Sequence, residues 1–175
     1  MKSLSDQMSV YAAYHRHPVN RAIHFVGIPA IVWSLMVFLG FVTLFEAGGL
    51  EVTLALLAVV ALMAWYLLLD FPFGVASTAL FTVLLVSALH LPRAAGNGTA
   101  MWIAGGVFVL GWVVQFIGHA VWEKRRPALM DNLVQVFVAP IFLVAETAFA
   151  MGLRPELHDE VRTKMQAHLP KRARA

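Results

Sequence analysis

The sequence has no cysteine and few charged residues. Asp, Glu, Lys and Arg make up 13% of its 175 residues, against about 25% in a soluble protein. Without cysteine, disulfide scaffolds, thiolate metal sites and thiol nucleophiles are excluded, so any metal must be held by His, carboxylate or carbonyl groups. Apolar residues make up 60% of the chain and the mean hydropathy is +0.75. A soluble globule of this size could not bury them, so we expect a membrane protein.

The positive charge of the chain does not indicate nucleic-acid binding. The net charge is +3 and the pI is about 9.6, but the basic residues form short blocks between apolar runs, without interleaved aromatic side chains. Basic blocks at the ends of apolar runs are typical of membrane topology. We therefore expect the lipid bilayer, and no nucleic acid, as a partner.

Four apolar runs approach the length of about 20 residues that a helix needs to cross a bilayer. The only Lys, Arg, Asp or Glu in the four runs is Glu51, near the start of the second run. They extend from about Ala22 to Phe45, Leu50 to Leu69, Gly74 to Leu91 and Thr99 to Val121. The predicted fold class is all-α, a multi-pass transmembrane bundle. Residues 1–151 are expected to form one integral-membrane domain and residues 152–175 a basic cytoplasmic tail.

A fifth apolar run, from Leu133 to Met151, carries Gln135, Pro140 and Glu146. A carboxylate at membrane depth is costly unless it faces protein or water. We interpret this run as a broken, re-entrant or cytoplasm-facing helix.

The basic residues predict the orientation of the chain. The first seven residues are too polar for a signal peptide, so the spans themselves direct insertion. If four runs cross and the fifth does not, both termini are cytoplasmic, and all of the 13 Lys and Arg except Arg93 lie on that side. Five crossings would place six of them on the wrong face.

The predicted topology separates the seven histidines. His15, His17 and His24 lie at the cytoplasmic entrance of the first span, and His119 lies at the cytoplasmic exit of the fourth. His90 closes the third span on the opposite side, about 25 Å away. The two remaining histidines are expected to be solvated in the tail; they are His158 and His168.

Polar residues near these histidines recur at helical spacing. Gln115, His119 and Glu123 follow one another every four residues, and Asn20 lies one turn before His24. In a membrane such a stripe turns toward protein. A few neutral imidazoles with nearby carboxylates suit Fe(II), Zn(II) or Mn(II), and the spacing does not choose among them.

Two other hypotheses fit the same pattern. In one, His24 and His119 are the axial ligands of a haem, or the chain is a quinone-linked redox protein. In the other, the chain is a non-catalytic scaffold whose polar stripes only join helices. Visible absorption bands and metal content distinguish these hypotheses from a mononuclear site.

Two sequence blocks resemble the signature of the Mpo1-like family. The first runs from Tyr14 to Pro29, and the second begins with Gln115 to His119. The second block continues through Glu123, Pro127 to Leu129, Asp131 to Leu133, Pro140 and Glu146. The resemblance covers essentially the whole chain, and it is specific because both blocks occur in the right order at span ends.

The resemblance implies an Fe(II)-dependent dioxygenase that uses O₂ to convert 2-hydroxy fatty acids into fatty acids one carbon shorter. It implies His15, His24 and His119 as iron ligands, with His17 as a further candidate. From the residue pattern, Glu123 is a candidate catalytic residue, and Glu123 or Glu146 would either bind the metal or orient a histidine that does. The remaining candidates are residues for substrate binding, of which the basic ones would attract the carboxylate: Tyr14, Asn20, Arg21, Gln115, Lys124, Arg125 and Glu146.

Overall fold

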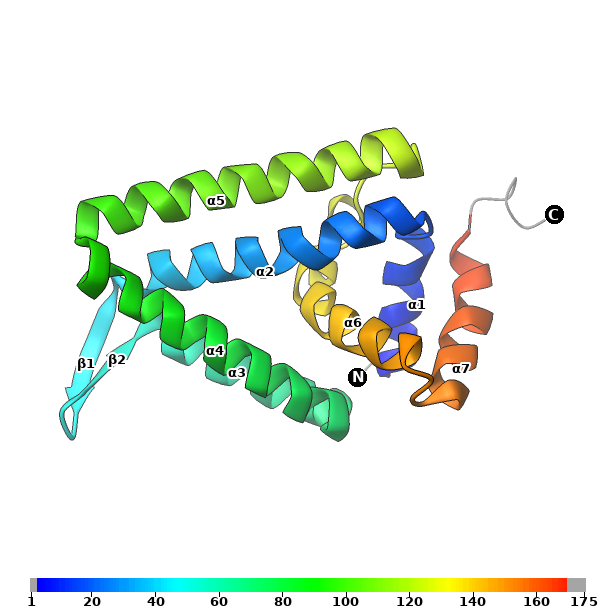
Figure 1. Ribbon diagram of the computed structural model, residues 1–175. Helices are drawn as coiled ribbons and strands as arrows, with labels where there is room; N and C mark the ends of the chain where they lie inside the picture. The colour runs from blue at the N-terminus through cyan, green and yellow to red at the C-terminus, as the bar shows by residue number, and fades with distance from the viewer. Residues whose placement is uncertain (1–2, 170–175) are drawn as a thin grey trace. The chain divides into compact units, whose positions relative to one another are not determined.

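The computed structural model describes residues 3–169, which are mostly helical (Figure 1). The elements follow in the order α1 Leu4–Tyr14, α2 Pro18–Gly40, β1 Thr43–Ala47, β2 Leu50–Thr53, α3 Leu54–Leu69, α4 Phe71–Ala95, α5 Asn97–Gly118, α6 Val134–Ala150 and α7 Pro155–Met165. A π-helical turn continues α5, and two short 3₁₀ turns follow later; they are His119–Glu123, Ala128–Met130 and Gln166–His168.

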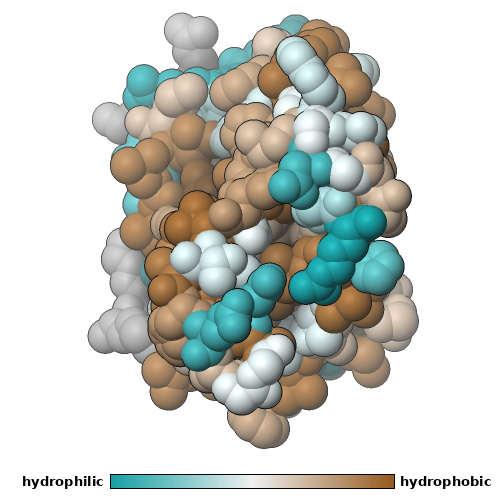
Figure 2. All heavy atoms as spheres, turned by 90° about the vertical axis from the view of Figure 1, so that its left-hand side faces the viewer, coloured by the Kyte–Doolittle hydropathy of each residue, from teal (hydrophilic) through white to brown (hydrophobic). Residues whose placement is uncertain are grey.

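Among the described residues, three helices are long and apolar enough to cross a membrane. These are α2, α4 and α5 with its π-helical continuation, of 23, 25 and 27 residues. Large apolar side chains on them face outward; Trp102 is 85% exposed and Val83 is 67% exposed. Figure 2 likewise shows a largely hydrophobic surface broken by a few hydrophilic groups. Helix α3 has 16 residues, so the fourth predicted crossing stays a prediction.

The segment between α2 and α3 departs from the all-α expectation. Helix was predicted as far as Phe45 and again from Leu50, whereas α2 ends at Gly40 and an antiparallel hairpin, β1–β2, follows. Gly48 and Gly49 form its turn with φ of 58° and 79°. Two consecutive positive φ values match the right-handed twist of the strands and favour glycine. The apolar runs are therefore interrupted by a hairpin that hydropathy alone does not reveal.

Helices α3 and α4 pack side by side within the unit Val26–Val114. A single residue, Asp70, separates them, and its Oδ1 accepts a hydrogen bond from the N–H of Phe73 (3.1 Å). A Cβ at Gly74 would lie 2.7 Å from the backbone of Leu67, so only glycine allows the two helices to approach so closely.

The other unit, Met1–Phe25 with Gln115–Ala175, holds α1, α6 and α7. Helix α6 continues through Pro140, so the interpretation of a broken helix is wrong. The i−4 carbonyl that Pro140 leaves unbonded belongs to Val136, in the first turn of α6. Whether α6 is re-entrant or faces the cytoplasm stays a prediction.

The predicted tail contains a helix that docks on the N-terminus. Helix α7 packs against α1, where Lys164 bonds Asp6 (2.5 Å) and Ser5 Oγ donates to Glu160 (2.8 Å). The ring of His158 stacks on Phe149 at 4.6 Å and is half-buried, so it is less solvated than predicted. His168 is exposed, as predicted. The basic residues at the end of the tail lie outside the described residues; they are Lys171, Arg172 and Arg174.

Candidate metal centre

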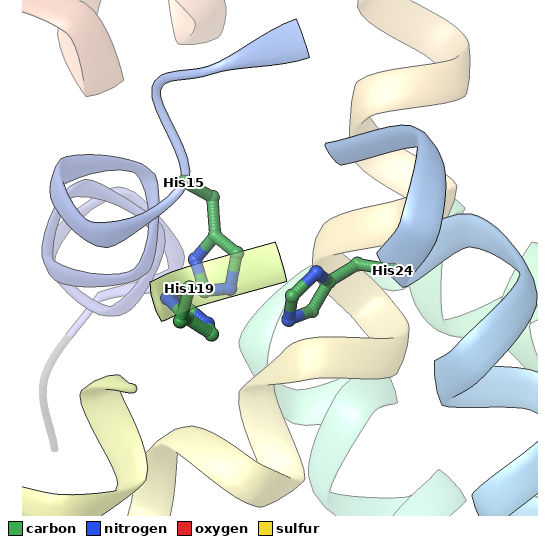
Figure 3. A group of neighbouring side chains, drawn as sticks. All are labelled: His15, His24 and His119. Atoms are coloured by element: carbon green, nitrogen blue, oxygen red, sulfur yellow. The ribbon is translucent and has the colours of Figure 1, made fainter. Parts of the chain in front are cut away.

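Three buried histidines from three segments lie together in the unit Met1–Phe25 with Gln115–Ala175. His15 follows α1, His24 lies near the start of α2, and His119 opens the π-helical turn after α5. Their ring centroids are 4.4, 4.7 and 5.0 Å apart. One nitrogen of each ring lies within 4.8 Å of the other two. Figure 3 shows the imidazoles gathered around a common point.

The ring of His15 is held by the helix that precedes it. His15 is the C-cap of α1, and its Nδ1 lies 2.8 Å from the carbonyl oxygen of Tyr11. The His15 ring stacks on the Tyr11 ring at 3.9 Å, with the Phe142 ring 6.4 Å away. Burial, with a further effect of nearby His24, lowers the pKa of His15 well below its ordinary value. The imidazole is therefore neutral at physiological pH, the form that binds metals.

The same type of hydrogen bond orients His24. Its Nδ1 lies 2.8 Å from the carbonyl oxygen of Asn20, four residues earlier in α2. A carbonyl oxygen only accepts hydrogen bonds, so Nδ1 carries the proton in both His15 and His24. Each Nε2 then keeps its lone pair. Proteins commonly orient metal-binding imidazoles in this way.

His119 occupies a turn with a wider backbone. Residues His119–Glu123 form a π-helical turn directly after Gly118, and such turns are frequent at functional sites. Nδ1 of His119 is buried and has no hydrogen-bond partner among residues 3–169. A Cβ at Gly118 would collide with Oδ1 of Asn20. Glycine at this position lets the segment that carries His119 approach the start of α2.

The three imidazoles fit a divalent transition metal. Nε2 of His15 and Nδ1 of His119 are both buried without a partner in the described part of the chain. A buried unsatisfied polar atom costs about 1–3 kcal/mol, so these nitrogens are where a ligand is expected. Neutral nitrogen ligands without thiolate suit Fe(II), Zn(II) or Mn(II), and three ligands leave coordination positions open.

A family model described as 2-hydroxy-palmitic acid dioxygenase Mpo1-like matches residues 1–151. The chain belongs to the Mpo1-like family. It is also similar to the 2-hydroxy-palmitic acid dioxygenase MPO1 of Saccharomyces cerevisiae, with 36% identity over 155 residues. That match covers 88% of this chain and 84% of the yeast protein. No solved structure matches the chain significantly. The resemblance predicted from the two sequence blocks is therefore confirmed.

Two predicted residues of this Mpo1-like protein, His17 and Glu123, are not in the group of three described histidines. Nδ1 of His17 accepts a hydrogen bond from the N–H of Val19 (3.2 Å). Oε1 of Glu123 accepts hydrogen bonds from the N–H of His17 (2.8 Å) and from Nδ2 of Asn20 (3.2 Å). Glu123 thus ties the start of α2 to the π-helical turn that carries His119.

The basic residues predicted to attract a carboxylate have other contacts or face outward. Arg21 forms a 2.9 Å ion pair with Glu146 of α6. The guanidinium of Arg125 lies 3.4 Å from the centre of the Tyr14 ring. Lys124 is exposed, with a φ of 49°.

Tyr14 belongs to a network next to His15. Its hydroxyl donates to Oδ2 of Asp131 (2.6 Å), and Asp131 pairs with Arg126 (2.5 Å). Burial and this hydrogen bond raise the pKa of Tyr14, so it stays a neutral donor. The network joins the end of α1 to the loop that precedes α6.

Sequence reasoning missed two aromatic residues that support the centre. Tyr11 stacks on His15, and Phe142 lies 4.5 Å from the Tyr11 ring. The spacing of four between Tyr11 and His15 was a usable signal, because it places both side chains on one helix face. The contact of Phe142 is long-range and leaves no local pattern.

Proposed function

We propose that this protein is a membrane-bound, Fe(II)-dependent dioxygenase that uses O₂ to convert 2-hydroxy fatty acids into fatty acids one carbon shorter. The observation that carries the proposal is the group of three buried imidazoles, two of them oriented through Nδ1 by backbone carbonyls. Support for the substrate class comes from the 36% identical yeast protein, which is named a 2-hydroxy-palmitic acid dioxygenase.

The reaction balances with O₂ as the sole oxidant. A 2-hydroxy acid and O₂ give the shortened acid, CO₂ and water when the bond between carbons 1 and 2 breaks. Carbon 2 rises from the alcohol to the carboxyl level and carbon 1 leaves as CO₂, which together release the four electrons that O₂ accepts. An iron ion held by three imidazoles would supply the one-electron chemistry that O₂ requires, with positions left for the substrate hydroxyl and carboxylate.

The residues of the chain would prepare this reaction in three ways. The carbonyl groups of Tyr11 and Asn20 keep two imidazoles in the metal-binding tautomer. The Tyr11 and Phe142 rings exclude water from one side of His15. Glu123 holds the start of α2 and the turn after α5 in one arrangement. We infer a positioning role for Glu123 rather than metal binding.

We also propose that α2, α3, α4 and α5 all cross the membrane, that α6 does not, and that both termini are cytoplasmic. The acyl chain of the substrate would then lie among the apolar spans, and its head group would reach the histidines at the cytoplasmic end. Reporters fused before Lys2 and after Ala175 should both read cytoplasmic. An external C-terminus would mean that α6 crosses and that the four-span topology is wrong.

The activity itself is tested with purified protein loaded with Fe(II) under anaerobic conditions. Addition of 2-hydroxypalmitic acid and O₂ should yield the fatty acid with one carbon fewer, detected by mass spectrometry, in proportion to bound iron. A Soret band in the purified protein would instead indicate haem. Absence of both stoichiometric metal and product would favour the scaffold hypothesis.

A further inference from the structure

A buried carboxamide on α6 has no hydrogen-bond partner among residues 3–169. Gln135 is 1% exposed, and neither Nε2 nor Oε1 has a hydrogen-bond partner among the described residues. Leaving a buried donor or acceptor unpaired costs about 1–3 kcal/mol for each group. Such groups are rare in folded proteins, and each one calls for an explanation, such as an ordered water or a bound ligand.

Helical spacing places Gln135 on the face of α6 that carries Phe142, a neighbour of the histidine centre. Phe142 follows it by seven residues, about two helical turns, and so lies on the same helix face. The Phe142 ring packs against Tyr11 and near His15. Figure 1 shows α6 beside α1, the helix that ends at His15, and the two helices are in contact.

A second buried carboxamide, on α5, has one unpaired atom. Gln115 lies one turn before His119, is 8% exposed, and its Nε2 has no partner in residues 3–169. Two unpaired amide groups thus belong to helices that carry or support the imidazoles. If these side chains only joined helices, their amide atoms would be bonded to neighbouring residues.

The basic side chains predicted to attract a carboxylate already have partners or face outward. Arg21 is paired with Glu146, Arg125 stacks on Tyr14, and Lys124 is exposed. Among the described residues, the carboxamides of Gln115 and Gln135 instead carry buried donors without a partner.

We propose that the carboxamide of Gln135, assisted by that of Gln115, binds the head group of the 2-hydroxy acid. Nε2 of Gln135 donates to a carboxylate oxygen, and Oε1 accepts from the 2-hydroxyl group. A carboxamide presents a donor and an acceptor side by side, which complements the acceptor and donor of a 2-hydroxy acid. This inference rests on the proposed function and assigns its substrate selectivity to α6.

The test compares Gln135→Met with the parent protein and with Gln166→Met, which makes the same change at an exposed position. Methionine keeps the size of the side chain and removes the unpaired polar atoms, so Gln135→Met should retain its thermal stability and its Fe(II) content. Its affinity for 2-hydroxypalmitic acid, measured without O₂, should fall about 10- to 100-fold. In turnover, KM should rise by a similar factor with kcat near the parent value.

A second measurement uses the parent protein without metal, so that chelation cannot contribute. It should bind 2-hydroxypalmitic acid about tenfold more tightly than the 2-methoxy analogue, because only the hydroxyl donates to Oε1. This measurement also tests the assignment of Gln135 if the Gln135→Met variant fails to fold.

The outcomes separate the two proposals. If the parent protein neither binds nor converts 2-hydroxypalmitic acid, the proposed function is wrong and the assignment of Gln135 falls with it. If the parent is active while Gln135→Met binds substrate equally well, only the assignment of Gln135 is wrong. Equal binding of the hydroxy and methoxy acids by the metal-free parent would also overturn the assignment.

Discussion

Replacing Gly118 with alanine should disturb the metal centre without touching a ligand. Gly118 is the last residue of α5 and has helical dihedral angles, with φ of −53° and ψ of −49°. Its backbone would therefore accept alanine without strain. The obstacle is steric, because the new Cβ would lie closer to Oδ1 of Asn20 than the 3.0 Å that real Cβ atoms keep. Asn20 is fully buried and donates to Glu123 (3.2 Å).

The expected cost follows from these contacts. Overpacking a buried site costs about 1–3 kcal/mol, and losing the bond from Asn20 to Glu123 adds about 1 kcal/mol. Alanine gains about 0.5–1 kcal/mol over glycine in a helix. The net loss for Gly118→Ala is about 1–3 kcal/mol of folding free energy. Because Asn20 also orients His24, Fe(II) affinity should fall about 10- to 100-fold, as for other residues that support metal ligands.

Gly106→Ala in the same helix is the matched control. A Cβ at Gly106 would meet no atom of the described residues within 4 Å, so only the helix propensity acts and stability should rise by about 0.5–1 kcal/mol. Both variants are measured by reversible unfolding in detergent, followed by circular dichroism, and by anaerobic Fe(II) titration. If Gly118→Ala matches Gly106→Ala in stability and metal affinity, the close approach at Gly118 has no energetic role.

Three further results are expected. His119→Ala should lower Fe(II) affinity more than about 100-fold and abolish product formation, whereas His90→Ala, outside the group of three, should keep both; equal metal loss in two folded variants would refute this site. Glu123→Gln should weaken Fe(II) binding by about 10- to 100-fold without abolishing it, and complete loss would identify Glu123 as a ligand. Hydrogen bonds from Lys164 and Ser3 lower the pKa of Asp6 to about 2. The stabilising contribution of Asp6 is therefore full above its unfolded pKa and lost as the pH falls through about 2; hydrogen exchange in α7 should accelerate over that range in the parent and not in Asp6→Asn.

The sequence predicted the apolar helices because hydropathy is a property of the residues themselves. For the runs that became α4 and α5, three of the four predicted boundaries lie within two or three residues of the observed ones. The boundary between α2 and α3 was wrong because a hairpin and a helix of the same hydropathy look alike in such a scan. The pair Gly48 and Gly49 carried the turn signal and lay between the two predicted runs, but the strands on either side were assigned to the apolar runs.

Helix α1 was missed for a different reason. Its sequence is too polar for a span, but Ser3 and Asp6 form a capping box that starts a helix. The docking of α7 on α1 depends on contacts between residues more than 150 positions apart, such as Ser5 with Glu160. No local pattern predicts such contacts, which is why the tail was expected to be a separate appendage.

The grouping of His15, His24 and His119 could be predicted because span ends on the same side of a membrane are forced together. The same reasoning did not separate His17 from the other three, since His15 and His17 are only two residues apart. The separation depends on the C-cap conformation of His15 and on the hydrogen bond that its Nδ1 donates to the carbonyl oxygen of Tyr11, which turn this side chain inward. Backbone conformation at a helix end is not encoded in residue spacing.

The distribution of unpaired polar atoms argues for a ligand site rather than for helix packing alone. Among the described residues, buried side-chain atoms without a partner occur on His15, Asn20, Gln115, His119, Gln135 and Ser77. All of these except Ser77 belong to the unit that contains the three histidines. Side chains that merely join apolar helices satisfy one another, because an unpaired polar group is most costly where water is absent. Donors and acceptors that stay unpaired together, next to neutral imidazoles, are arranged for a polar molecule or ion that comes from outside the chain.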